Sequence, residues 1–291
     1  MTSSSDPLRY GDAEIADLIT IWEGVARDLI ALGRDCDATQ WAAPTPCPGW
    51  TVGDLIAHLI GIERRMMGEP PPDHAPDWSS LPHAQGPIGQ FTELDVDYRR
   101  AHSQASVLAE ADEVVANRLA YLRSGPQERD TDVKGVMGRP VPNHYMISLR
   151  IFDMWAHGQD ARTALNRPGD LGGPGAWISA GRIISALPIV VAKDMATPPG
   201  TLARIDVTSS GDSSVEFVRL VLVDPDKRGV FVDDASMALE PTFGITCEWD
   251  LFSRIACGRL DVRSDSVRER VTFSGDQQMC ESFLVEIGIT P

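Results

Sequence analysis

Apolar residues recur at helical spacing through the first part of the chain. Between residues 13 and 33 they fall three and four positions apart, which is the pattern of one buried helix face. These apolar positions are Ile15, Leu18, Ile19, Trp22, Val25, Leu29 and Leu32. A second helix is predicted from Thr51, because the sequence T-x-x-D from Thr51 to Asp54 resembles a capping box. Three further helices are predicted, over about 91–122, about 140–165 and about 176–194.

The pattern changes after residues 195–201 (MATPPGT), whose composition is typical of a linker. Beyond this segment, alternating apolar and polar residues predict strands, and two short helices are predicted near the end. The predicted strands are ARIDVTSS (203–210), SVEFVRLVLV (214–223), the stretch from GVFVDD to ASMALE (229–240) and VTFSG (271–275), and the predicted helices are EWDLFSRIACGRL (248–260) and DQQMCESFLVEIG (276–288). The sequence therefore predicts a helical domain over residues 1–195 and a smaller α+β domain over residues 201–291.

A long proline-rich segment separates the second and third predicted helices. Residues 69–89 hold six of the 21 prolines, so we expect an irregular loop in which His74 and His83 are exposed. On the helix that follows, charged residues are expected to form a solvated face, made of Asp95, Asp97, Arg99 and Arg100. At the start of the fourth helix, Pro140 and Pro142 suit the first turn, where a missing N–H does no harm.

Composition narrows the classes of function. The chain has 43% hydrophobic and 23% charged residues, as globular proteins do. Its formal net charge of -16 at pH 7 argues against binding to nucleic acid or to an anionic membrane, since both need a basic surface. No apolar run approaches the roughly 18 residues of a membrane span, and the segment MTSSSDPLRYGDAE does not resemble a secretory signal.

The cysteines indicate a reducing, cytoplasmic environment. They are odd in number and widely spaced, without a C-x-x-C motif, so they do not suggest a disulfide framework. Cys47 lies between two prolines in a tight turn and could be a reactive thiol. The alternative for Cys47 is a small, buried apolar side chain, which is the common role of a free cysteine.

Asp153 and His157 are the strongest candidates for chemistry. They lie at i and i+4 in RIFDMWAHGQDAR (150–162), so a helix places both on one face. A carboxylate and an imidazole held in this way can bind one divalent cation together with a third ligand, for which His58 on the second helix is the best candidate. The alternatives are an exposed i,i+4 pair and an ordinary core histidine. Such a set suits zinc, and equally iron, nickel or manganese.

Three more residues are candidates for roles beside a bound cation. Asp160 could orient a ligand or a bound water, or else pair with a surface arginine. Arg150 could hold a carboxylate of a substrate or thiol, or else be an ordinary surface arginine. Arg219, on a predicted strand, could close over the site, or else be an edge arginine with its stem on apolar surface. The chain has no H-E-x-x-H, P-loop, G-x-S-x-G or G-x-G-x-x-G motif, which excludes several common enzyme classes.

Two segments resemble the signatures of one family. WAAPTPCPGWTVGDLIAHL (41–59) and RIFDMWAHGQDARTALNRPGDLGGPGA (150–176) resemble those of the mycothiol-dependent maleylpyruvate isomerase family, in the DinB-like superfamily. The segments DLFSRIACGRLD and VTFSGDQQMCESFL are similar to the sterol-carrier-like domain attached to this family. The resemblance implies a DinB-like four-helix bundle with a divalent metal, usually zinc, followed by a small α+β domain.

The resemblance also implies the ligands and the cosubstrate. By motif position the ligands are His58, Asp153 and His157, with aspartate where the maleylpyruvate isomerases proper have glutamate. Gly158 stands where many relatives have glutamate. The implied thiol is mycothiol, which as a thiolate would attack a small electrophilic substrate and lead to isomerisation or S-transfer.

Two other functions remain open from the sequence. In one, the sterol-carrier-like domain binds a small apolar ligand or lipid without catalysis, and the helical bundle is a scaffold. In the other, the chain is a DinB-like enzyme of an ergothioneine-type thiol pathway, although a second domain of about 90 residues is smaller than the usual partner domain of such enzymes.

Overall fold

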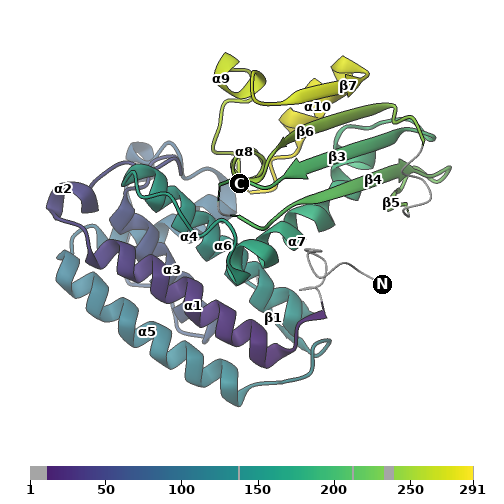
Figure 1. Cartoon of the computed structure of the whole chain (residues 1–291). Coiled ribbons are helices and arrows are strands. Elements are labelled where there is room, and N and C mark those ends of the chain that lie inside the picture. Colours follow the sequence, from purple (N-terminus) through teal and green to yellow (C-terminus); the bar gives the residue numbers. More distant parts are fainter. Residues whose placement is uncertain (1–11, 137, 212, 233–238, 291) are drawn as a thin grey trace. The chain divides into compact units, whose positions relative to one another are not determined.

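The computed structural model describes residues 12–136, 138–211, 213–232 and 239–290 (Figure 1). It divides into two compact units, of which the first comprises residues 13–170 and the second comprises Asp12 and the described residues from 171 onward. The predicted linker at 195–201 therefore lies inside the second unit, and the boundary between the units falls at the end of the fourth long helix of the chain. The segment MTSSSDPLRYGDAE, which does not resemble a secretory signal, lies mostly outside the described residues.

The first unit is built from four long helices, α1, α3, α5 and α6, which pack on one another (Figure 1). Its elements are α1 (Ile15–Arg34), α2 (Ala38–Trp41), α3 (Val52–Met66), η2 (Trp78–Ser80), α4 (Gly86–Arg99), α5 (Gln104–Ser124), β1 (Asp132–Lys134), β2 (Pro140–Pro142) and α6 (Asn143–Ala164). The shorter helix α4 packs against α3. Large side chains such as Trp22, Leu55 and Ile151 are fully buried between the helices, because their helices present one apolar stripe to the core.

Helix α3 begins where the sequence predicts it. The Thr51 side chain accepts a hydrogen bond from the Asp54 backbone N–H, and the Asp54 side chain accepts one from the Thr51 N–H, which together form a capping box. The box satisfies two backbone donors that the first turn of a helix leaves unpaired. This start places His58 within the buried part of α3.

The helix predicted over 91–122 is two helices, α4 and α5, separated by a turn at residues 100–103. The Ser103 side chain accepts a hydrogen bond from the Ser106 N–H and so caps α5. The predicted solvated face is wrong for Asp95 and Arg99, which are 4% and 5% exposed. Because α4 packs on α3, Asp95 lies directly over Gly61, where a side chain would collide with it.

The sequence predicts that Pro140 and Pro142 lie in the first turn of α6, but this prediction is wrong, because they lie in strand β2. This strand pairs antiparallel with β1, and α6 starts at Asn143. The reason is that a residue before proline prefers an extended backbone, which suits a strand better than a helix.

The second unit has the α+β architecture that the sequence predicts. Its elements are α7 (Pro174–Ile189), η3 (Val190–Asp194), β3 (Leu202–Thr208), β4 (Phe217–Val223), β5 (Gly229–Phe231), β6 (Phe243–Glu248), α8 (Trp249–Ala256), α9 (Asp265–Arg268), β7 (Thr272–Gly275) and α10 (Gln277–Glu286). The strands form one sheet in the order β5-β4-β3-β6-β7. The pair β3–β6 is parallel and its neighbours are antiparallel. Strand β6 was not among the predicted strands, and most of ASMALE lies outside the described residues.

Helix α7 belongs to the second unit because it contacts β4, β5 and α8. Its apolar residues, together with those of the π-helical turn η3, are mostly buried. The span Pro174–Asp194 is long and apolar enough to cross a membrane by length and composition, with a mean hydropathy of 1.6 and 67% of its window buried. The expectation that no apolar run reaches such a length is therefore corrected, and the burial is that of a core helix.

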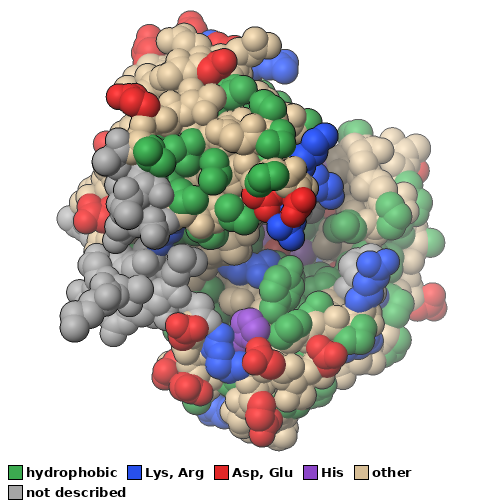
Figure 2. All heavy atoms as spheres, turned by 90° about the vertical axis from the view of Figure 1, so that its right-hand side faces the viewer, with side chains coloured by type: hydrophobic (Ala, Val, Ile, Leu, Met, Phe, Trp, Pro, Cys, Tyr) green, Lys and Arg blue, Asp and Glu red, His purple; other side chains and the backbone are tan. Residues whose placement is uncertain are grey.

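Acidic and basic side chains lie side by side on the surface. On the face drawn in Figure 2, the basic side chains of the described residues occur in small groups beside acidic ones and not as one continuous basic area. This distribution agrees with the formal net charge of -16. The absence of nucleic-acid binding stays a prediction.

Asp170, just beyond α6, gives a prediction about stability. Its φ of 57° is left-handed, a conformation that asparagine adopts readily, and burial raises the pKa of its carboxyl from 3.8 to about 6. Between pH 3.8 and about pH 6 the carboxyl of Asp170 is mostly ionised in the unfolded chain but mostly protonated in the folded protein. The free energy of unfolding therefore falls as pH rises through this range, and the full loss is present above about pH 6. We expect Asp170→Asn to stabilise the protein at pH 8 by on the order of 1 kcal/mol, discounted for partial exposure, and hardly at all at pH 3.5. Urea unfolding at both pH values measures this, and an equal gain at both would contradict the assignment.

Candidate metal centre

Helices α3 and α6 bring His58, Asp153 and His157 together. One donor atom from each lies within 4.8 Å of the other two. His58 Nε2 is 3.1 Å from Asp153 Oδ2, and His157 Nε2 is 3.9 Å from Asp153 Oδ1. The two histidines are 4% and 6% exposed, whereas the Asp153 side chain is 29% exposed and opens the cluster to solvent. The structure thus groups the predicted ligands, and their role as ligands stays a prediction.

Asp160 lies beside the imidazole of His157, on the side of its Nδ1 atom. Its Oδ2 lies 3.2 Å from His157 Nδ1, and Asp160 is 3% exposed, so it is not a surface partner of an arginine. A proton on Nδ1 facing this carboxylate leaves the Nε2 lone pair on the side of Asp153. A carboxylate behind a histidine is the usual second partner of a metal-binding imidazole.

The charge states of the cluster suit a cation. Burial lowers the pKa of His58, which favours the neutral imidazole with its free lone pair. Burial would raise the pKa of Asp153, but the nearby Arg150 guanidinium and His58 hold it well below its ordinary value. Asp153 is therefore ionised at neutral pH. The Nδ1 atom of His58 is buried without a hydrogen-bond partner in the described structure.

Arg150 is buried and is therefore not a surface arginine. Its Nη1 donates to Asp153 Oδ2 over 2.8 Å, and its Nε donates to Glu63 Oε1 over 2.8 Å. Glu63 is 0% exposed and also accepts from Arg118 Nε over 3.1 Å. Arg118, Glu63 and Arg150 therefore form a buried series of ion pairs that ends at Asp153. The last of these pairs restrains the Asp153 carboxylate.

Trp50 covers the cluster and was not singled out from the sequence. Its ring centroid is 4.8 Å from that of His58 and 5.4 Å from that of His157, and the two imidazoles are 4.9 Å apart. Trp50 directly precedes the capping box of α3, so its place is set by the start of that helix. The signal in the sequence was the tryptophan of C-P-G-W-T, two turns before His58.

Cys47 lies close to the same cluster. Its Sγ, a nitrogen of His157 and an oxygen of Asp160 all lie within 4.8 Å of one another. Cys47 is partly exposed, unlike Cys36, Cys247, Cys257 and Cys280, which are buried. The prediction of a small buried side chain is therefore wrong for Cys47.

The two histidines of the proline-rich segment are partly buried and paired, not exposed. His74 Nε2 lies 2.7 Å from Asp97 Oδ2, and His83 Nε2 lies 3.0 Å from Glu93 Oε2. The segment is therefore tied to α4 by its side chains, although its backbone is irregular.

Arg219 lies in the second unit. It is on β4, where its Nη1 donates to the carbonyl oxygen of Val218 over 2.8 Å and its guanidinium lies over the Phe217 ring at 5.8 Å. The proposed role of Arg219 at the cluster stays a prediction.

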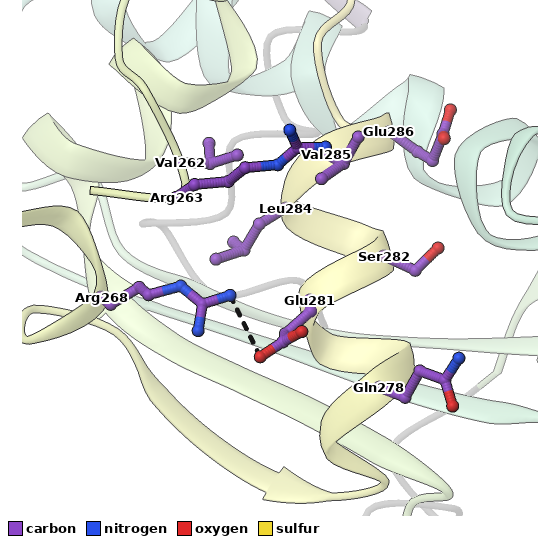
Figure 3. Close-up of a pocket in the computed structure, with 9 residues that line it drawn as sticks. All are labelled: Val262, Arg263, Arg268, Gln278, Glu281, Ser282, Leu284, Val285 and Glu286. Carbon is purple, nitrogen blue, oxygen red and sulfur yellow. Dashed lines mark ion pairs between the residues drawn. The ribbon is translucent and has the colours of Figure 1, made fainter. Parts of the chain in front are cut away.

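A groove of about 300 Å³ lies on the second unit beside α10 (Figure 3). Arg268 and Glu281 form an ion pair across it at 3.0 Å. Its lining residues are Val262, Arg263, Arg268, Gln278, Glu281, Ser282, Leu284, Val285 and Glu286. Six of these nine residues are polar or charged, and Val262, Leu284 and Val285 are apolar.

The fold and the cluster define the class of this protein. It has a helical bundle, with two imidazoles and a carboxylate between two of its helices, followed by an α+β domain. Residues 22–162, which include the cluster, match the family model described as the mycothiol maleylpyruvate isomerase N-terminal domain. This match places residues 22–162 in the mycothiol-dependent maleylpyruvate isomerase family and confirms the resemblance drawn from the two signatures.

Two relatives share part of the sequence. Both are uncharacterized proteins of Mycobacterium tuberculosis, from two strains, and each is 31% identical over 139 residues. The match covers 47% of this chain and 52% of each relative, so the chain spans about half the length of these relatives.

Two solved structures share the fold. They are crystal structures of the mycothiol-dependent maleylpyruvate isomerase and of a histidine-to-alanine mutant of it, with 15% and 14% identity and a TM-score of 0.54. Each match covers 94% of this chain and 96% of the other. At this identity the likeness establishes the α+β fold of both parts of the chain.

Proposed function

We propose that the chain is a cytoplasmic enzyme that uses a divalent cation, with zinc as the first candidate, to activate mycothiol against a small electrophilic substrate. The observation that carries the proposal is the convergence of His58, Asp153 and His157 within 4.8 Å. Family membership supports mycothiol as the thiol and isomerisation as the reaction. S-transfer, in which the thiol adduct is retained, is the other outcome of the same chemistry.

The donor set fits a divalent cation. Two imidazoles and one carboxylate are the ligands of many catalytic zinc sites, which keep a further position open. A cation bound there supplies positive charge that keeps an approaching thiol deprotonated at neutral pH. Two of the three side chains favour the states that a cation needs, since Asp153 is held ionised and burial favours neutral His58.

The surrounding residues have separate roles in this proposal. Asp160 holds a proton at His157 Nδ1, and Arg150 holds the Asp153 carboxylate in place. Trp50 excludes water from the faces of the two imidazoles.

Elemental analysis of the purified protein tests the proposal. We expect about one metal ion per chain in the wild type and loss of most of it in His157→Ala. His102→Ala is the matched control, because His102 is an exposed histidine of the same unit outside the cluster. No metal in the wild type after zinc is supplied, or an equal content in His157→Ala, would sink the proposal. Apolar ligand binding by the second domain is not favoured by the family.

A further inference from the structure

The indole of Trp50 restrains both imidazoles of the candidate metal centre. The ring planes are tilted by 40° to His58 and by 43° to His157, at centroid distances of 4.8 and 5.4 Å. Trp50 is 8% exposed, so its neighbours hold it on nearly every side. An imidazole ligand must keep one nitrogen aimed at its cation. Whatever fixes this indole therefore also limits the rotation of both rings.

One buried carboxylate fixes the indole. Trp50 Nε1 donates to Glu93 Oε2 over 2.6 Å, and Glu93 is 1% exposed. The same oxygen lies 3.0 Å from His83 Nε2, and Arg100 Nη1 donates to the other oxygen over 2.6 Å. A buried carboxylate with such partners on both oxygens is rigid, since leaving any of the groups unpaired is costly. Glu93 lies on α4 and is not one of the clustered donors.

The same network reaches the start of the helix that carries His58. Arg100 Nε donates to Asp54 Oδ1 over 3.1 Å, and Asp54 is the residue that closes the capping box of α3. Glu93 thus connects through Arg100 to the first turn of α3 and through its other oxygen to Trp50. The indole and the helix are held by one group of charges.

Gly49 makes this arrangement possible. Its φ is +78°, and a Cβ atom there would lie 2.3 Å from His83 Nδ1. A side chain at position 49 would therefore push His83 away from Glu93. The sequence C-P-G-W-T combines the turn, the space for His83 and the indole in consecutive residues.

We propose that Glu93 is a positioning residue of the candidate metal centre, which acts through Trp50 to fix the imidazoles of His58 and His157. This inference rests on the metal-dependent function proposed above. Glu93 touches neither imidazole by a hydrogen bond of its own, so its effect on a bound metal passes through the indole.

Binding of cobalt(II) to the full chain tests the inference. Trp50→Phe keeps an aromatic ring and removes the N–H donor, and Glu93→Gln keeps the shape and removes the charge. We expect both to weaken cobalt(II) binding by about tenfold or more and to change the visible absorption of the bound ion, as loss of outer partners does. Trp41→Phe is the matched control, because Trp41 also lies against α3, at Gly53, away from the imidazoles, and should leave both readouts unchanged.

The outcomes separate this inference from the proposal on which it rests. A wild type that binds no cobalt(II) overturns the metal centre, and the positioning role with it. A wild type that binds, with both variants folded and unchanged in affinity and absorption, overturns the positioning role alone. If Glu93→Gln does not fold, as circular dichroism would show, Trp50→Phe still decides, since Glu93 keeps Arg100 and His83 in that variant.

Discussion

Asp153→Ala is expected to lower the affinity of the chain for zinc by more than about 100-fold, because loss of an outer partner alone costs 10–100-fold. The substitution removes one donor of the cluster and leaves the buried Arg150 guanidinium facing the two imidazoles. A positive charge at that place repels a cation, so the two effects add. Competition with a chromophoric chelator measures the dissociation constant.

Asp153→Glu is the matched variant for this prediction. It keeps the negative charge that balances Arg150, and the resemblance to the maleylpyruvate isomerases proper places glutamate at this position. We expect its zinc affinity to stay within about tenfold of the wild type, since the ligand type is unchanged. Zinc binding by Asp153→Ala as tight as that of the wild type would remove Asp153 from the ligand set.

Glu63→Ala is expected to destabilise the helical unit by about 3–5 kcal/mol, because it breaks a buried ion network by removing one partner. Glu63 is 0% exposed and accepts hydrogen bonds from Arg118 and Arg150, which are 4% and 3% exposed. Without the carboxylate, two guanidinium groups remain in the core with their main partner gone. In thermal unfolding this corresponds to a fall in Tm of about 6–20 °C.

Glu69→Ala is the control for this second prediction. Glu69 pairs with Arg64 on the surface, with 38% of its side chain exposed, and should cost less than about 1 kcal/mol. Calorimetry of wild type and both variants at one pH compares the transitions. Equal Tm values for Glu63→Ala and Glu69→Ala would show that the buried network does not contribute as argued.

The local parts of the candidate centre could be predicted from the sequence. Asp153 and His157 share a helix face by their spacing, and the capping box at Thr51 sets the start of α3 and so the depth of His58. These features depend on residues close in the chain. Helix spacing and capping act within one or two turns, so a sequence pattern carries them.

The parts that could not be predicted depend on residues distant in the chain. Arg150 looked like a surface arginine because its buried partner, Glu63, is 87 residues away. The break between α4 and α5 has no proline or glycine, and Ser103 was its single local signal. Residues 195–201 have the composition of a linker, whereas the division into two compact units falls before α7, because α7 packs on strands that follow it in the chain.

The donors His58 and Asp153 are separated by 95 residues along the chain. A cation that binds both therefore links two distant segments of the folded chain, and it is released when the chain unfolds. Since the unfolded chain does not hold the donors together, tight binding adds directly to stability, by about 4.1 kcal/mol at a thousandfold excess over Kd. Heat resistance and metal supply should consequently rise and fall together in this protein.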